Sequence, residues 1–156
     1  MKQNIVQVLM AGIGTLGFAL YFRVNKKHTA AATIGGLLAW TIYLIIYSMT
    51  GSIFWGNMIA SMIVCIWSEL MARILKAPTN TFMIPGIIPL LPGGTLYYTM
   101  EAMLQRNKKV FVQKGLETVM ITVGIVVGIV AVSVIFVYFL TLLGKYKENS
   151  NSKLTH

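Results

Sequence analysis

Charged residues are scarce in this sequence. They make up 11% of its 156 residues, whereas a soluble globular domain contains roughly 25%. Four intervals contain no Asp, Glu, Lys or Arg at all, namely residues 3–22, 29–68, 77–100 and 118–144. A chain whose long segments lack charge while its short connections carry it is typical of a protein that crosses a lipid bilayer several times. The composition therefore excludes a water-soluble domain and an intrinsically disordered chain.

Cysteine and acidic residues are also scarce. Cys65 is the only cysteine, which excludes a disulfide within the chain, and its apolar neighbours predict a small buried side chain. The chain has four acidic residues and two histidines. Within the apolar segments these residues form no metal-ligand spacing and no Ser/His/Asp or Cys/His catalytic set. We therefore expect a protein that is not an enzyme and that uses no metal or cofactor.

The net charge of +9 comes largely from short basic clusters beside the apolar segments. Clustered Lys and Arg residues would suit nucleic acid, but the clusters at residues 23–27 and 106–109 directly flank apolar stretches. In that position basic residues set membrane orientation and contact anionic lipid head groups. We therefore expect the lipid bilayer, and no nucleic acid, as a partner.

The lengths of the charge-free intervals predict five membrane segments. A spanning helix needs about 20 residues at 1.5 Å per residue, so residues 29–68 must hold two segments, with a turn at the small polar stretch 48–52. We expect one all-α membrane domain over residues 1–145 and a polar, disordered tail over 146–156. The domain would be a multi-pass bundle in the cytoplasmic membrane, with segments at 4–22, 29–48, 53–72, 80–104 and 116–143.

The distribution of Lys and Arg bears on the path of the fourth segment. If all five segments cross, five basic residues share the side of the N-terminus and eight lie on the other side. If residues 80–104 enter and leave on the same side, the split becomes nine against four. Because basic residues accumulate on one side of a membrane, the count weakly favours a re-entrant fourth segment and leaves the crossing arrangement open.

Proline and glycine interrupt this fourth segment. Three of the four prolines lie in it, and each proline lacks the backbone N–H that a helix requires. Unsatisfied peptide groups cost several kcal/mol each in hydrocarbon, so such backbone must pack within protein or line a wet cavity. Discontinuous helices of this kind recur in secondary transporters, and a simple kink in a packed helix is the alternative.

A helix that restarts after residue 92 would present free N–H groups at its positive end, which suits a carboxylate. We expect the amides of Gly93, Gly94 and Thr95 to bind that carboxylate, with Thr95 as the helix cap and Tyr97 or Tyr98 orienting the substrate. The residues expected to form the substrate pathway are Pro85, Gly86, Pro89, Pro92, Gly93, Gly94, Thr95, Tyr97 and Tyr98.

Small residues recur four positions apart in the apolar segments. Residues 12–17 match the glycine pattern of a dinucleotide site, but they lie inside an apolar segment with no preceding strand, so close helix packing is the better interpretation. The same packing is expected for Gly124 with Gly128, for Gly56 with Ala60 and for Ala32 with Gly36.

Residues 85–94 read Pro-Gly-Ile-Ile-Pro-Leu-Leu-Pro-Gly-Gly, Tyr97 follows them, and a basic stretch that ends in proline precedes them at 73–78. In this pattern the chain resembles the threonine/serine exporter family, and within it the short subunits that resemble the C-terminal half of the fused exporters. The resemblance covers roughly residues 5–145. It implies export of small carboxylate-bearing metabolites, either threonine and serine or a dicarboxylate such as succinate. It also implies an obligatory partner, a larger membrane subunit, and the alternative is a membrane scaffold or assembly protein that transports nothing.

A coupled exporter needs a titratable group at membrane depth. Glu69 precedes Arg73 by four residues, so the two share a helix face and can pair. An interfacial ion pair and a coupling role are both consistent with this spacing. Glu101 and Glu117 lie next to basic residues, so Glu69 is the first candidate for coupling, with Arg73 as its partner.

Overall fold

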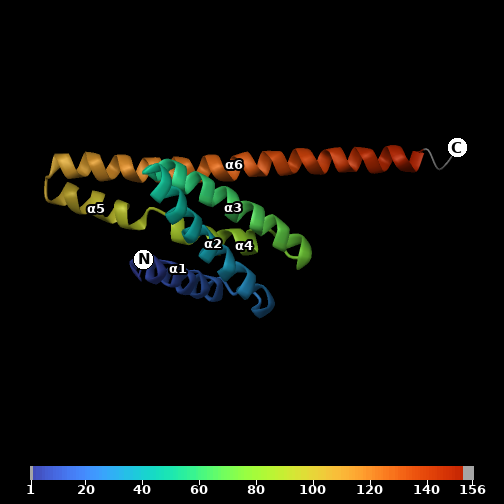
Figure 1. Ribbon diagram of the computed structural model, residues 1–156, viewed down its shortest axis with the longest axis horizontal. Coiled ribbons are helices and arrows are strands. Elements are labelled where there is room, and N and C mark those ends of the chain that lie inside the picture. The colour runs from blue at the N-terminus through green and yellow to red at the C-terminus, as the bar shows by residue number, and fades with distance from the viewer. Residues whose placement is uncertain (1, 153–156) are drawn as a thin grey trace.

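The computed structural model describes the backbone of residues 2–152 and the side-chain environment of residues 4–139 and 141. Over this range the chain is all-helical (Figure 1), as the composition predicts. The elements are α1 (Lys2–Tyr21), α2 (Lys26–Thr50), α3 (Ile53–Ile74), α4 (Asn80–Ile87), the 3-10 turn η1 (Ile88–Leu90), α5 (Gly93–Leu104) and α6 (Lys108–Ser152).

Four helices are long and apolar enough to cross a membrane. Their candidate spans are Asn4–Tyr21, Lys26–Thr50, Ile53–Ile74 and Lys108–Phe139. The fourth expected segment, residues 80–104, is present as the short elements α4, η1 and α5. The expected all-α membrane fold with a broken fourth segment is therefore confirmed. The division into a domain and a disordered tail stays a prediction, since α6 is helical as far as Ser152 and residues 153–156 lie outside the described range.

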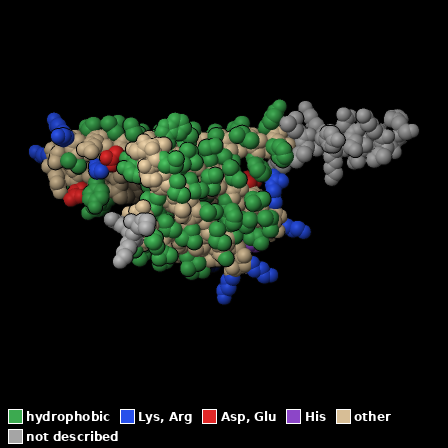
Figure 2. Space-filling model, viewed as in Figure 1, with side chains coloured by type: hydrophobic (Ala, Val, Ile, Leu, Met, Phe, Trp, Pro, Cys, Tyr) green, Lys and Arg blue, Asp and Glu red, His purple; other side chains and the backbone are tan. Residues whose placement is uncertain are grey.

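Helix α2 packs against α1, α3 and α4 (Figure 1), while α6 packs against α3 and α5. The bundle has two ends, which we name by the connections they carry. The α1–α2 end holds the connection at residues 22–25 and also the α3–α4 connection at residues 75–79. The α2–α3 end holds the turn at Gly51 and Ser52. On the face drawn in Figure 2, Lys and Arg side chains gather toward the ends of the molecule and hydrophobic side chains lie between them, as a membrane protein requires.

The turn at the α2–α3 end is shorter than the expected 48–52. Ser48 donates its hydroxyl to Ile45 O at 2.7 Å and Thr50 donates to Ile46 O at 2.8 Å, so both residues stay in the helix. Gly51 then ends α2 with a φ of 64° and donates its N–H to Tyr47 O. A left-handed φ costs glycine little, which explains its place at this helix end.

The helices approach one another most closely at small residues. A Cβ added at Gly124 would lie 2.8 Å from Phe54 O, and one added at Gly128 would collide with Met58 O and the Ser61 hydroxyl. On the other side of the bundle a Cβ at Gly36 would collide with Thr15. These contacts join α6 to α3 and α2 to α1, so the predicted role in helix packing is confirmed for Gly36, Gly124 and Gly128. It is wrong for Gly14 and Gly17, since a Cβ added at either glycine would meet no atom within 4 Å.

The broken segment runs from one end of the bundle to the other. Near its start Thr79 contacts Glu69, which lies toward the C-terminal end of α3. At its middle Leu90 shares a buried cluster with Ile121 and Ile125 of α6. Beyond this point α5 packs on the first part of α6, away from the α1–α2 end (Figure 1). Its two termini thus lie at opposite ends, which favours the crossing arrangement over the re-entrant one.

Candidate functional site

The candidate site is the break between α4 and α5. Pro85 lies within α4, so the helix continues past it, and the regular backbone is interrupted between Pro89 and Pro92. The N–H of Leu91 donates to Ile88 O at 3.1 Å, and the N–H of Gly93 donates to Leu91 O at 2.8 Å. These short-range bonds replace helical ones, because the prolines at 89 and 92 have no N–H to donate.

The α4 side of the break is packed inside the protein. Phe82, Pro85 and Gly86 are buried between α2 and α3. A Cβ added at Gly86 would lie 3.0 Å from Val64 Cγ1, and one added at Gly35 would lie 4.0 Å from Gly86 Cα. Glycine at 35 and 86 therefore lets two backbones approach closely. Irregular backbone is tolerated at membrane depth under this condition.

The α5 side of the break is open. Gly93 and Gly94 are exposed, and a Cβ added at either glycine would meet no atom within 4 Å. Tyr97 and Tyr98 are 64% and 54% exposed, and their rings meet edge to face with centroids 5.5 Å apart. The nine residues expected to form the pathway are thus divided between two environments. Pro85 and Gly86 are buried, Pro89, Pro92 and Thr95 are partly buried, and Gly93, Gly94, Tyr97 and Tyr98 are exposed.

Two details at the start of α5 differ from expectation. Thr95 does not cap the helix: α5 already begins at Gly93, and the Thr95 hydroxyl donates to Pro92 O at 3.1 Å. The N–H of Gly93 is not free either, since Leu91 O accepts it. Within residues 2–152, the amides of Gly94 and Thr95 donate to no backbone or side-chain acceptor. The donors that α5 offers to an anion are therefore these two amides.

The expected ion pair between Glu69 and Arg73 does not form. Glu69 Oε1 accepts a hydrogen bond from the Thr79 hydroxyl at 3.2 Å, and the Arg73 guanidinium lies 4.7 Å from the ring centroid of Phe136. The spacing of four residues puts both side chains on one helix face, but the α3–α4 connection and α6 supply closer partners. Glu69 therefore ties the start of the broken segment to α3.

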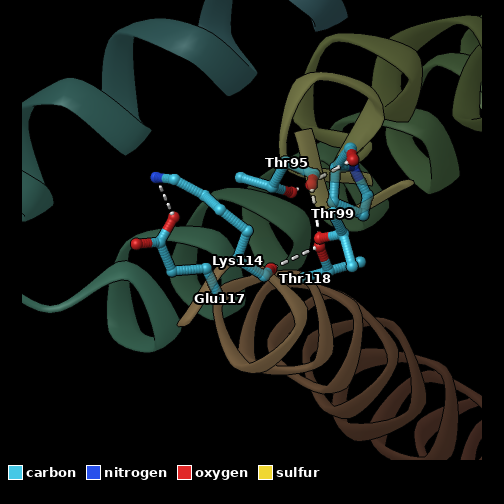
Figure 3. Close-up of polar contacts among 6 residues, drawn as sticks. Thr95, Thr99, Lys114, Glu117 and Thr118 are labelled. Carbon is cyan, nitrogen blue, oxygen red and sulfur yellow. Dashed lines mark hydrogen bonds and ion pairs between the residues drawn. The ribbon is translucent and has the colours of Figure 1, made fainter. Parts of the chain in front are cut away.

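The facing sides of α5 and α6 carry polar groups, of which Thr99, Lys114 and Thr118 were not predicted from the sequence. Figure 3 shows Thr95, Thr99 and Thr118 beside an ion pair between Lys114 and Glu117. Lys114 Nζ lies 2.8 Å from Glu117 Oε2. Thr99 and Thr118 donate their hydroxyls to carbonyls one turn earlier in their own helices, at 2.7 and 2.8 Å. The recurrence of threonine at a spacing of four in 95–99 was the signal that could have identified a polar face.

A cavity of about 550 Å³ opens at the α1–α2 end and reaches the broken segment. Its walls come from the α1–α2 connection, the α3–α4 connection and α4, and Pro85 forms part of its lining. Its lining includes Arg23, His28 and Lys76. The sequence gives no sign of this cavity, because its walls are far apart in the chain. Among the described residues no group of three His, Cys, Asp or Glu side chains could hold a metal ion.

The chain was compared with families and with individual proteins. Residues 7–135 match the family model described as "Threonine/Serine exporter, ThrE". No curated protein and no solved structure matches the chain. The matched range includes most of α1, all of α2 to α5 and the spanning part of α6 almost to its end, and so contains the whole broken segment.

Proposed function

The chain belongs to the threonine/serine exporter family, and from this premise we propose that it is one subunit of a secondary transporter for small carboxylate-bearing metabolites. Threonine and serine, or a dicarboxylate such as succinate, are the substrates that fit this proposal. Membership of a transporter family implies a function other than catalysis. We further propose that the subunit exports its substrate across the cytoplasmic membrane.

One observation supports the proposal most strongly: a helix break that is packed on one side and open on the other. The packed side, at Pro85 and Gly86, fixes the break within the bundle. The open side presents the amides of Gly94 and Thr95 at the positive end of α5. Freed amides at a half-helix end bind anionic substrate groups in discontinuous transporter helices. In this proposal the two amides bind the carboxylate, and Tyr97 or Tyr98 orients the rest of the molecule.

The polar groups between α5 and α6 extend this site. Thr95 and Thr99 lie on the helix that begins with the free amides, and their side chains face the start of α6. Hydroxyl groups can accept and donate hydrogen bonds, which suits the amino and hydroxyl groups of threonine and serine. The Lys114–Glu117 pair lies beside them. We propose that Glu69 serves proton coupling at the opposite end of the segment, where it contacts Thr79.

The exposure of the open side of the break also favours a partner subunit that covers it. The start of α5 leaves two backbone donors unpaired, and unpaired donors are costly in a bilayer unless protein or water satisfies them. Leu96 and Met100 of α5 are 50% and 61% exposed and offer apolar surface to a neighbouring helix. We propose that a larger membrane subunit covers this face and completes the pathway. A scaffold that transports nothing is the competing function, because a docked partner alone would also cover α5.

Efflux from intact cells tests the proposal. Cells that express this chain with the larger subunit, or either protein alone, would be loaded with labelled threonine, serine or succinate. We expect export of at least one of these substrates only when both proteins are present. Gly94→Leu should abolish export, since the leucine side chain would stand over the free amides.

The matched control for this variant is Gly17→Leu. Gly17 is also an exposed helical glycine with no atom within 4 Å of an added Cβ, so both variants add the same side chain to open space. We expect Gly17→Leu to export normally and both variants to insert and fold. Normal efflux from Gly94→Leu would remove the α5 start from the pathway. Absence of efflux for all three substrates would favour the scaffold.

A further inference from the structure

The cavity at the α1–α2 end has a basic lining with no carboxylate partner. Arg23 and Lys76 line it, and no Asp or Glu does. The ion pair found among the described residues joins Lys114 to Glu117 and lies on α6. Glu69, the acidic residue of α3, accepts a hydrogen bond from Thr79. The two basic groups of the cavity therefore have no internal counter-ion within the described part of the chain.

Backbone geometry fixes the positions of these two basic residues. Arg23 has a φ of 55° and Lys76 a φ of 51°, and each follows the end of a helix. In both turns the residue directly after the basic one donates its backbone N–H to the preceding helix. Val24 N–H donates to Ala19 O, and Ala77 N–H donates to Ala72 O, each at 3.0 Å. These are tight helix-ending turns in which glycine is the usual residue. The C-terminal ends of α1 and α3 carry partial negative charge, which offsets part of the positive charge of Arg23 and Lys76. The two basic side chains can therefore stay without a carboxylate partner when no ligand is bound.

A polar atom of the lining lacks a partner. His28 Nδ1 is buried and has no hydrogen-bond partner, while its ring packs edge to face on Phe82 with centroids 5.7 Å apart. A buried polar atom without a partner is uncommon and costs stability. At the start of α4 the N–H groups of Thr81 and Phe82 are already used, since they donate to Pro78 O and Thr79 O. The polar groups of the cavity on which the proposal rests are therefore its side chains.

We propose that this cavity binds an anionic oxygen group, held by Arg23 and Lys76 beside the His28 ring. Its volume of about 550 Å³ admits a small organic acid or a lipid head group. A carboxylate of a metabolite and the phosphate of a lipid share this chemistry. If the source is the metabolite, the cavity is a waiting site for the transported carboxylate, because Pro85 of the broken segment lines it. That last role rests on the proposed function, whereas anion binding does not.

Histidine NMR of the full chain in lipid nanodiscs tests the binding without transport. The protein would carry labelled histidine and His156→Gln, so that His28 gives the signal. In nanodiscs of phosphatidylcholine, we expect titrated succinate to shift the His28 signal to saturation. In nanodiscs that contain phosphatidylglycerol, a shift without succinate would identify an anionic lipid head group as the occupant. No saturable shift with succinate and no difference between the two lipids would overturn the proposal.

Charge variants assign the effect to the cavity. Arg23→Gln should weaken the binding about tenfold, since it removes one charge-assisted hydrogen bond. The matched control is Arg106→Gln, because Arg106 also follows a helix end, with the same φ of 55°, but lies outside the cavity. Lys76→Gln provides a second test if Arg23→Gln fails to fold. Equal loss of binding in Arg23→Gln and Arg106→Gln would indicate nonspecific attraction and would also overturn the proposal. If the protein binds succinate in the nanodisc assay but exports none of the substrates in the efflux assay, the waiting site is rejected and anion binding by the cavity still stands.

Discussion

Replacing Gly128 with alanine tests the packing of α6 on α3. The added Cβ would collide with Met58 O and the Ser61 hydroxyl, and a backbone carbonyl cannot rotate away as a side chain can. Extra atoms in a packed interior typically cost about 1–3 kcal/mol. Alanine also favours a helix over glycine by about 1 kcal/mol, so the net loss for Gly128→Ala alone is about 0–2 kcal/mol.

A matched variant removes the helix-propensity contribution. Gly17→Ala makes the same change in a membrane helix, but an added Cβ at Gly17 meets no atom within 4 Å. The free energies of unfolding of the two variants should therefore differ by the packing cost alone, about 1–3 kcal/mol, with Gly17→Ala the more stable. Titration of the purified protein with sodium dodecyl sulfate, followed by tryptophan fluorescence, measures this difference. Equal stability of the two variants would refute the close contact between α3 and α6.

Two further contacts are testable in the same unfolding assay. Trp67→Phe should cost about 0.5–1.5 kcal/mol, because it removes the hydrogen bond from Trp67 Nε1 to Ala31 O at 2.9 Å; an unchanged midpoint would argue against that bond. Arg73→Gln should cost about 0.5–2 kcal/mol, since it removes the cation over the Phe136 ring. The same loss in Arg73→Gln with Phe136→Leu already present would show that the two side chains do not interact.

The helices of this protein were predictable because the bilayer imposes a simple rule on composition. Long charge-free intervals predicted α1, α2, α3 and α6, and the break in the fourth segment followed from its prolines. The helix limits were less predictable. Ser48 and Thr50 look like turn residues, but their hydroxyls bond to helix carbonyls and keep α2 intact to Thr50. Pro85 lies inside α4 as the sixth of its eight residues, although a proline has no N–H to donate to Thr81 O.

The site was predictable only where proline and glycine interrupt the pattern of a regular helix. Gly86 and Gly94 were identified by their prolines, but their different environments depend on which helices pack against them. The spacing of Glu69 and Arg73 fixed a shared face and could not reveal Thr79 or Phe136 as closer partners. The basic cavity left no periodic signal, because residues 22–28 and 76–85 meet only in the folded chain.

Cysteine accessibility at Gly94 tests most directly whether the α5 start borders an aqueous path for a carboxylate solute. Cys65 is buried and is the only cysteine, so Cys65→Ala gives a background for single cysteines. Cells would express each variant together with the larger subunit and be treated with a membrane-impermeant maleimide. We predict that Gly94→Cys is labelled, that the transported substrate slows this labelling, and that Gly17→Cys in α1 is not labelled. Labelling of Gly94→Cys that no substrate changes, or no labelling at all, would contradict the account.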